Sequence, residues 1–290
     1  MKVLLIDGDR MLNHRHLFPN LALMKLSAWH KANSDEILPV NFLLQSNIDR
    51  AYLSMVFPCE RIWSLVLTDI YRYGGSGFDN WEWLPEEIEH TCPDYSLYDC
   101  NYAMGFTSRG CPRSCAFCIV PKKEGKWRAT ASIYEFWRGQ ERLRLLDNNL
   151  TANENHCVDV LGQILKEGIQ VDFSQGLDIR FLTSRVASLL AQVRLWKQIH
   201  FAWDQIGDES KVRKGIALLE QAMPLSRVMF YVLIGFDSSP EEDLYRVETL
   251  QGLGVDPFVM PYRKTQYTQR FARWVNHKAI FKTVKWEDYP

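Results

Sequence analysis

Short apolar runs alternate with amphipathic stretches along the chain. Residues 3–6 form a continuous apolar run typical of a buried strand, and Leu23, Leu26 and His30 then recur at helical spacing. Further apolar runs cover residues 37–44 and 51–57, and a glycine-rich turn at 73–77 follows a weaker fourth run. This pattern predicts a small parallel sheet with helical connections in the first part of the chain.

A second set of apolar runs follows a break in this pattern. Residues 84–96 are rich in Pro, Glu and Asp, so we place a domain boundary after residue 96. Six predicted strands then follow, at residues 102–106, 143–146, 171–173, 199–202, 228–234 and 258–260. The segments between them are long enough for crossover helices, but six parallel strands are too few to close a complete barrel.

The predicted fold class is therefore α/β, with three parts. A small N-terminal Rossmann-like domain with a parallel sheet covers residues 1–96, and a partial (β/α)6 TIM-like barrel covers 97–262. Residues 263–290 form a basic, aromatic C-terminal extension. In such barrels the active site lies at the C-terminal ends of the strands.

Composition adds limits to this picture. With 290 residues, 47% of them hydrophobic and 24% charged, the chain has the composition of a globular protein. The run at 3–6 meets Asp7 too soon for a secretory signal, and no apolar run is long enough to cross a membrane. We therefore expect a cytoplasmic protein without a membrane partner. The formal charge of -1 means that a nucleic acid would have to be recognised through a local patch.

The candidate chemistry lies in a cysteine cluster. Three of the seven cysteines, Cys111, Cys115 and Cys118, have the spacing CxxxCxxC, and soft thiolate ligands select zinc, Cu(I) or iron–sulfur clusters. Structural zinc needs four protein ligands, for which the nearest further candidates are His156 and Cys157. Three ligands leave one coordination position open, which suits a cluster that binds a substrate.

The motif resembles that of the radical S-adenosylmethionine (SAM) superfamily, in which an aromatic residue precedes the last cysteine, as Phe117 does here. The resemblance covers residues 102–262. It implies that Cys111, Cys115 and Cys118 hold a 4Fe-4S cluster whose remaining iron chelates SAM. It also implies an electron donor such as flavodoxin or ferredoxin, reductive cleavage of SAM to a 5′-deoxyadenosyl radical, and hydrogen abstraction from a substrate that the motif does not specify.

The same resemblance assigns roles to residues at the strand ends. Polar residues after the second strand would hold the SAM amino group, those after the third its carboxylate or the substrate, and one after the fourth its ribose, while the fifth strand would contact adenine through its backbone. The cofactor-binding residues are then Phe117, Asn148, Asn149, Gln175, Arg180, Asp204, Ile234 and Gly235. Helix capping by the Asn and Asp side chains, and a solvated surface position for Arg180, are the alternatives.

The first 96 residues resemble the cobalamin-binding-like domain that precedes many radical SAM cores. Cobalamin binders of the base-off type carry the motif DxHxxG, whose His ligates cobalt. This sequence lacks that string, and His14 and His16 have no Asp and Gly partners at the required spacing. The sequence therefore argues against cobalamin.

Charge is segregated along the chain. Between residues 109 and 128 there are six basic residues and one acidic residue, and from residue 261 onward there are seven basic and two acidic residues. Interleaved aromatic residues in the tail suit an anionic substrate or RNA, whose bases would stack on them. The alternative is a helix over residues 266–275 that packs its aromatic residues inward.

Other functions are compatible with the sequence. A tRNA methylthiotransferase would need a second cluster, for which Cys59, Cys92 and Cys100 are the available cysteines, although their bunched spacing departs from that family. A metal-stabilised nucleic-acid-binding module and an electron-carrying cluster protein are non-enzymatic alternatives. Members of the superfamily share the radical generator and differ in the substrate pocket, so the substrate stays open.

Overall fold

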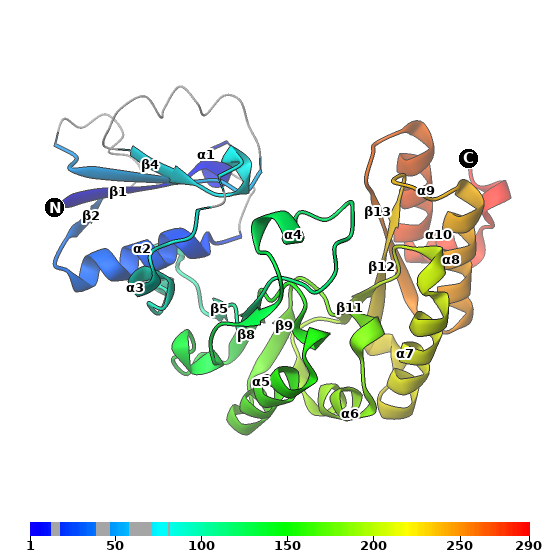
Figure 1. The fold of residues 1–290 in the computed structure, drawn as a ribbon. Coiled ribbons are helices and arrows are strands. Elements are labelled where there is room, and N and C mark those ends of the chain that lie inside the picture. The colour runs from blue at the N-terminus through cyan, green and yellow to red at the C-terminus, as the bar shows by residue number, and fades with distance from the viewer. Residues whose placement is uncertain (13–17, 39–46, 58–70, 81) are drawn as a thin grey trace. The chain divides into compact units, whose positions relative to one another are not determined.

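The computed structural model describes residues 1–12, 18–38, 47–57, 71–80 and 82–290 (Figure 1). The chain divides into two compact units. Unit 1 comprises Met1–Gly105 and Tyr134–Gln140, and unit 2 comprises Phe106–Ile133 and Glu141–Pro290. Both units combine helices with parallel strands, so the predicted α/β class is confirmed.

Unit 1 is built on a parallel sheet. Its strands β1 (Lys2–Asp7), β2 (Glu36–Leu38), β3 (Arg50–Ser54) and β4 (Tyr71–Gly74) lie in the order β2-β1-β3-β4. The continuous apolar run of β1 is buried because this strand is central and has a parallel neighbour on each side. The predicted small parallel sheet is thus present. Residues 39–44 of one predicted run, together with His14, His16 and Cys59, lie outside the described residues.

Helix α2 (Leu21–Ala32) packs on this sheet. It begins after Asn20, whose side chain caps the helix by accepting a hydrogen bond from the Leu23 N–H at 3.2 Å. Leu23 and Leu26 lie in one buried apolar cluster with residues of β1. Two further short helices, α1 (Gly8–Leu12) and α3 (Glu86–Glu89), complete the helical part of this unit.

All six strands predicted for the second part of the chain are present. They are β5 (Ala103–Gly105) in unit 1, followed in unit 2 by β8 (Arg142–Leu145), β9 (Gln170–Phe173), β11 (Ile199–Ala202), β12 (Val228–Ile234) and β13 (Asp256–Pro261). Strand β12, predicted from a continuous apolar run, is most deeply buried at alternate positions. Val228, Phe230, Val232 and Ile234 are completely buried, and the residues between them are partly exposed.

The prediction of one continuous six-stranded partial barrel is not confirmed. Within unit 2, β10 (Arg194–Leu195) pairs with β9, which pairs with β8, whereas β11, β12 and β13 form a separate sheet. The cause is a break after β10, since the chain leaves the edge of β9 there and resumes as β11 beside β12. The two sheets remain linked, because the Leu177 N–H donates to the His200 carbonyl at 2.7 Å.

Four helices connect these strands and lie along one side of them (Figure 1). They are α5 (Glu154–Glu167), α6 (Ser184–Gln192), α7 (Glu209–Ala222) and α8 (Pro240–Gly252). Local sequence sets their ends: Asn153 caps α5, and α8 begins with a capping box between Ser239 and Glu242. Among the described helices, none combines the length and the apolar character needed to cross a membrane.

The C-terminal residues pack inward. Helix α9 (Gln266–Asn276) confirms the predicted helix and is followed by α10 (Lys278–Thr283). Phe271, Trp274 and Phe281 are buried, with ring centroids 5.5 Å apart for the first pair and 4.9 Å for the second. These three aromatic rings belong to the core and are not exposed for stacking on bases.

A buried arginine joins the ends of two strands in unit 2. Arg246 of α8 is completely buried and pairs with Asp243 at 2.7 Å. Its guanidinium also donates to the carbonyl oxygens of Trp203, Asp204 and Leu233 at 2.7–3.0 Å. It therefore holds together the segments that follow β11 and end β12, where the candidate site lies.

Replacing Arg246 with Met should destabilise unit 2 by about 3–5 kcal/mol, because the Asp243 carboxylate would stay buried without its cation. The expected result is a lower urea midpoint for the unfolding transition of this unit. Arg213→Met is a matched control, since Arg213 forms an exposed pair with Glu209 on α7 and should leave the midpoint unchanged. Equal midpoints for both variants would contradict this role of Arg246.

Candidate functional site

The three motif cysteines lie on one loop of unit 2. Short antiparallel strands β6 (Ser108–Arg109) and β7 (Arg128–Ala129) form its base, and helix α4 (Val120–Lys123) follows the last cysteine. Gly110 has φ +78°, and the carbonyl oxygen of Gly125 lies 2.7 Å from the place that a Cβ would take. Only glycine fits there without a shift of the backbone, so Gly110 allows the loop to close at Cys111.

Three consecutive residues after β8 anchor this loop. The Asp147 carboxylate accepts four hydrogen bonds of 2.5–3.1 Å from the backbone N–H and the hydroxyl groups of Thr107 and Ser108. Asn148 Oδ1 accepts from the Gly110 N–H at 2.8 Å, and Asn149 Nδ2 donates to Cys111 Sγ at 3.3 Å. Burial raises the pKa of Asp147, and the four donated hydrogen bonds oppose that shift.

This arrangement differs from the helix-cap alternative drawn from the sequence for Asn148 and Asn149. Asn149 occupies the N-cap position of a 3-10 helix, Leu150–Ala152, but its side chain makes no capping hydrogen bond. The Asn148 side chain accepts from the cysteine loop instead of capping a helix. The side chains of both residues therefore contact the cysteine loop. Their assignment to the SAM amino group stays a prediction.

Polar donors also approach the thiols. Arg113 Nε donates to Cys115 Sγ at 3.3 Å, and the Cys118 N–H donates to the Cys115 carbonyl at 3.0 Å, which folds the second half of the motif into a turn. Burial raises the pKa of the Cys118 thiol, and the neighbouring thiols of Cys115 and Cys111 raise it further.

The soft thiolate donors suit an iron–sulfur cluster, whose irons each take one cysteine ligand. In the described ranges no group of three or more His, Cys, Asp or Glu side chains is arranged to hold a metal ion. Zinc, whose ligands converge on one point, stays the alternative. The nearby Asn149 amide and Arg113 guanidinium are suited to the negative charge on ligating thiolates.

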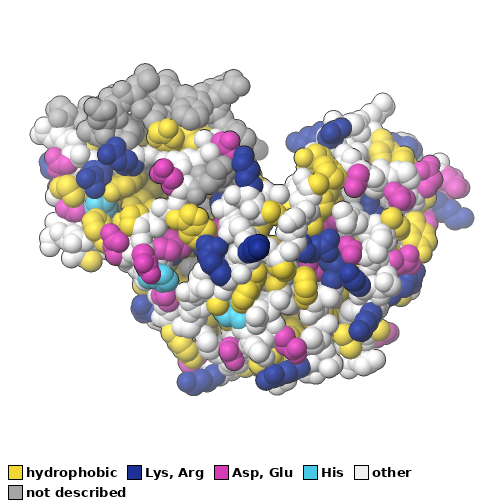
Figure 2. Space-filling view, viewed as in Figure 1, with side chains coloured by type: hydrophobic (Ala, Val, Ile, Leu, Met, Phe, Trp, Pro, Cys, Tyr) yellow, Lys and Arg dark blue, Asp and Glu magenta, His cyan; other side chains and the backbone are white. Residues whose placement is uncertain are grey.

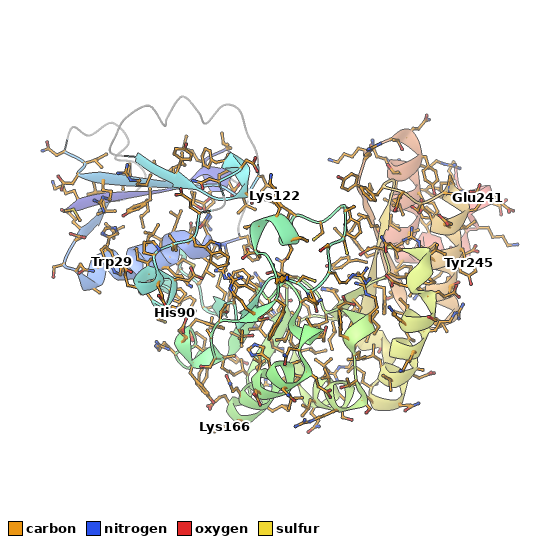
Figure 3. The ribbon with its side chains drawn as sticks, viewed as in Figure 1. Trp29, His90, Lys122, Lys166, Glu241 and Tyr245 are labelled. Carbon is orange, nitrogen blue, oxygen red and sulfur yellow. The ribbon has the colours of Figure 1, made fainter. Side chains whose placement is uncertain are left out.

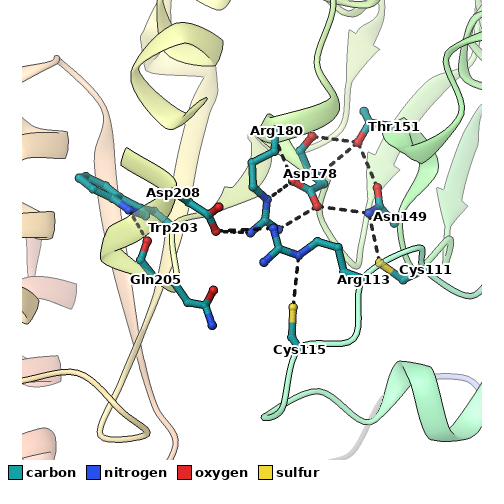
Figure 4. Close-up of polar contacts among 10 residues, drawn as sticks. All are labelled: Cys111, Arg113, Cys115, Asn149, Thr151, Asp178, Arg180, Trp203, Gln205 and Asp208. Atoms are coloured by element: carbon teal, nitrogen blue, oxygen red, sulfur yellow. Dashed lines mark hydrogen bonds and ion pairs between the residues drawn. The ribbon is translucent and has the colours of Figure 1, made fainter. Parts of the chain in front are cut away.

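A chain of polar contacts runs from Cys111 to Cys115 (Figure 4). The Arg180 guanidinium is held by both carboxylate oxygens of Asp178, at 2.6 and 2.8 Å, and by Asp208 at 2.6 Å. These contacts exclude the alternative of a solvated surface position. They also use three of the five N–H groups of Arg180, which we expected to face the SAM carboxylate or the substrate.

The ends of β11 and β12 supply the next predicted residues. Asp204 Oδ1 accepts from the Leu233 N–H at 3.2 Å, and burial raises the pKa of this carboxyl against the effect of Arg180, Arg246 and Arg113. Asp204 thus ties β11 to β12 and does not cap a helix. Gln175 is exposed on the turn after β9.

Aromatic contacts place the last motif residues beside the strand ends. Phe117 packs edge to face with Phe236 at 5.7 Å, and Phe236 packs with Tyr262 at 4.8 Å. The Ile234 side chain is completely buried, and its carbonyl accepts from the Tyr262 N–H at 2.9 Å. Gly235 has φ +73°, and an added Cβ would lie 2.9 Å from the methyl group of Thr268. Glycine at 235 is thus already required by the turn and by the packing of α9.

The remaining cysteines lie elsewhere. Cys157 is completely buried in α5, and burial raises the pKa of its thiol to about 12, as expected for a packing residue. Cys92 and Cys100 lie half-buried in unit 1, and Cys59 is outside the described residues. A second cluster on these three cysteines stays a prediction.

Many of the basic residues counted in the sequence have acidic partners. Arg109 and Lys123 pair with Glu124 at 3.3 and 3.9 Å, and Lys278 and Lys282 pair with Asp256 at 2.6 and 3.3 Å. Basic and acidic side chains are intermixed over the face shown in Figure 2. The segregation along the sequence is therefore reduced in space, while an anionic or RNA substrate stays a prediction.

Sequence reasoning missed two residues of this site. It treated Arg113 only as one of several basic residues near the cysteines, and it passed over Asp208, which lies 3.5 Å from the Arg113 guanidinium. The position of Arg113 between Cys111 and Cys115 was an available signal. Asp208 had none, because only the fold brings it to the loop.

Comparisons with known proteins agree with this geometry at the level of the fold. No family model matches the chain. The structure of the radical SAM methyltransferase TsrM from Kitasatospora setae, with cobalamin and a [4Fe-4S] cluster bound, superposes with a TM-score of 0.69 at 12% identity, covering 90% of this chain and 74% of that one. TsrM with tryptophan substrate and the SAM analogue aza-SAM bound gives 0.65 at 11% identity, covering 89% and 72%.

A curated relative is also a methyltransferase by name. The uncharacterized methyltransferase PH0819 of Pyrococcus horikoshii is 26% identical over 100 residues, which are 31% of this chain. The match spans 22% of that relative's length. Because TsrM has a similar fold and contains cobalamin, the comparison opposes our expectation that cobalamin binding is unlikely. The sequence lacks the DxHxxG string and therefore one way of ligating cobalt. The string concerns only the cobalt ligand and not the other contacts that a cobalamin-binding protein makes.

Replacing Asp147 with Ala should loosen the cysteine loop, because four buried donors lose a charged acceptor at a cost of about 1.5–3 kcal/mol for each hydrogen bond. We expect a lower thermal unfolding midpoint and less iron per chain after anaerobic reconstitution. Asp159→Ala is the control, since Asp159 is exposed on α5 and should change neither quantity. Full iron uptake and an unchanged midpoint in Asp147→Ala would refute the anchoring role.

Proposed function

We propose that the chain is an iron–sulfur enzyme of the radical SAM class, in which Cys111, Cys115 and Cys118 ligate a 4Fe-4S cluster. The observation that carries this proposal is the cysteine loop itself. Its three cysteines lie between Arg109 and Val120, Asn148 holds the loop at Gly110, and two of the thiols accept hydrogen bonds from Asn149 and Arg113. The similarity in fold to a protein with a bound [4Fe-4S] cluster supports it.

The bound cluster would supply one electron for reductive cleavage of SAM. The chain's residues would bind and orient SAM around it. Asp204 would accept hydrogen bonds from the ribose, the backbone at Ile234 and Gly235 would contact adenine, and Phe117 would pack beside the ligand. Asn148, Asn149 and Gln175 would provide further polar contacts. A one-electron donor such as flavodoxin or ferredoxin would reduce the enzyme.

Methyl transfer is a second candidate reaction, because TsrM and PH0819 are both named methyltransferases. In that case the methyl group of SAM is transferred and S-adenosylhomocysteine is released. In homolysis, by contrast, the radical abstracts hydrogen from substrate and 5′-deoxyadenosine is formed. Cobalamin binding by unit 1 belongs to the methyl-transfer proposal, since TsrM contains cobalamin.

Product analysis separates these reactions. The full chain is reconstituted anaerobically with iron and sulfide, reduced with dithionite and incubated with SAM, with and without cobalamin, before chromatography. 5′-Deoxyadenosine formed by the wild type and not by Cys115→Ala supports homolysis, and S-adenosylhomocysteine formed only with cobalamin supports methyl transfer. Tight zinc without a cluster would overturn the proposal, and a redox-active cluster that does not bind SAM would indicate an electron carrier.

Each of Cys111→Ala, Cys115→Ala and Cys118→Ala should abolish assembly of the intact cluster and leave a folded chain, because each removes one iron ligand. Iron and sulfide analysis with circular dichroism checks both parts. Cys157→Ala is the matched control, since this buried thiol lies on α5, and its iron content should equal that of the wild type. A full iron complement in any motif variant would refute the ligand assignment.

Asp204→Ala should retain the cluster and weaken SAM binding at least tenfold, because it removes the proposed ribose acceptor. Asp204→Asn keeps an oxygen that can accept from the Leu233 N–H and isolates the contribution of charge. Equilibrium dialysis with SAM measures both variants. Wild-type affinity in Asp204→Ala with a normal iron content would remove Asp204 from the SAM site.

A further inference from the structure

A continuous series of hydrogen bonds and ion pairs connects the thiols of Cys111 and Cys115 (Figure 4). Asn149 Nδ2, which donates to Cys111 Sγ, also lies 3.3 Å from Asp178 Oδ2. Arg180 joins Asp178 to Asp208, and Asp208 lies 3.5 Å from the Arg113 guanidinium that donates to Cys115 Sγ. We call the five residues between the thiols, Asn149, Asp178, Arg180, Asp208 and Arg113, the thiol-linking network.

The network has a consistent polarity. The groups that face sulfur are N–H donors, from the Asn149 amide and the Arg113 guanidinium. The two carboxylates contact these donors and Arg180, and no contact between them and sulfur is found in the described residues. Two arginines and two aspartates make the network neutral as a whole, so its effect on sulfur comes from the orientation of its dipoles and charges.

Burial makes these contacts strong. The exposed fractions of the side chains are 7% for Asp178, 11% for Arg180, 13% for Asp208 and 23% for Arg113. Solvent screens such groups less than it screens surface charges. The fork of Arg180 is held by both oxygens of Asp178, which fixes the geometry of the network from the ends of β9 and β11.

We propose that Arg113 and Asn149 are positioning residues that orient the Cys115 and Cys111 ligands and raise the reduction potential of the cluster, with Arg180, Asp178 and Asp208 holding them in place. This inference rests on the proposed function. Reduction adds one electron, taken from a low-potential donor, and lowers the cluster charge from 2+ to 1+. The added negative charge spreads onto the sulfurs, so N–H donors at sulfur stabilise the reduced state more than the oxidised state.

Arg180 acquires a different role under this inference. Its guanidinium nitrogens Nε, Nη1 and Nη2 all contact Asp178 or Asp208. These contacts use three of its five N–H groups, and they make it a positioning residue that acts through Asp208 on Arg113. The predicted signature of Arg180→Met is a shifted potential in addition to any change in SAM affinity.

The test is a titration of the reconstituted full chain with redox mediators, in which the reduced cluster is followed by electron paramagnetic resonance. Arg113→Met and Asn149→Leu remove the donors at sulfur and keep all three cysteines. Arg113→Lys keeps the positive charge without the planar fork. Lys122→Met is the matched control, because it removes one cation from α4, close in sequence to the cysteine loop (Figure 3).

Arg113→Met should retain the iron complement and lower the equilibrium constant for reduction at least tenfold, a shift of about 59 mV to more negative potential for one electron. Asn149→Leu should shift in the same direction, Arg113→Lys should shift less than Arg113→Met, and Lys122→Met should match the wild type. Wild-type potentials in Arg113→Met and Asn149→Leu, with full iron, would overturn this inference alone. A wild-type chain that assembles no cluster would overturn the proposed function as well. The circular dichroism spectrum of each variant should match that of the wild type, which separates these outcomes from misfolding.

Discussion

The segment Asp147-Asn148-Asn149 determines where the cysteine loop lies. Each of the three side chains contacts a successive part of the loop: first Thr107 and Ser108, then Gly110, then Cys111. The segment follows β8, a strand within a sheet, and only Leu146 lies between them. The sheet therefore fixes the position of the segment, and the segment fixes a loop that has little regular structure of its own. The position of the thiols therefore depends on three polar side chains that the sheet holds in place.

The same principle extends to the other strand ends. Arg180 follows β9, Asp208 follows β11, and Arg246 of α8 fixes the backbone at Asp204 and Leu233. Buried charges are costly unless they are paired, and each of these is paired at 2.6–2.7 Å. Ionic contacts thus stabilise the segments at the C-terminal ends of the strands in unit 2. The same contacts bring the polar side chains of the candidate site together, so these residues contribute both to rigidity and to the site.

Sequence patterns predicted those parts that depend on local order. The apolar run of β12, the helical spacing of Leu23 and Leu26 and the CxxxCxxC spacing are each contained in a few consecutive residues, so they could be identified without the fold. The division of the strands between two sheets could not be predicted from the sequence. It depends on a break after Leu195, and the apolar runs on the two sides of that break are similar in length and composition. The pair of Arg113 and Asp208 was also missed, since neither residue has a pattern that points to the other across the chain.

The residues assigned to SAM show the limit of a motif more sharply. Asn148, Asn149 and Arg180 lie near the cysteine loop, where their side chains already have partners in the chain: a backbone N–H, a thiol and two carboxylates. A motif identifies which residues gather at the strand ends, and the hydrogen-bond capacity of each side chain decides what it can still bind. Asn148 and Asn149 keep part of their polar capacity, and Arg180 uses three of its five N–H groups on Asp178 and Asp208. The two carboxylates therefore fix the orientation in which the remaining N–H groups of Arg180 can meet a ligand, and its assignment to SAM stays a prediction.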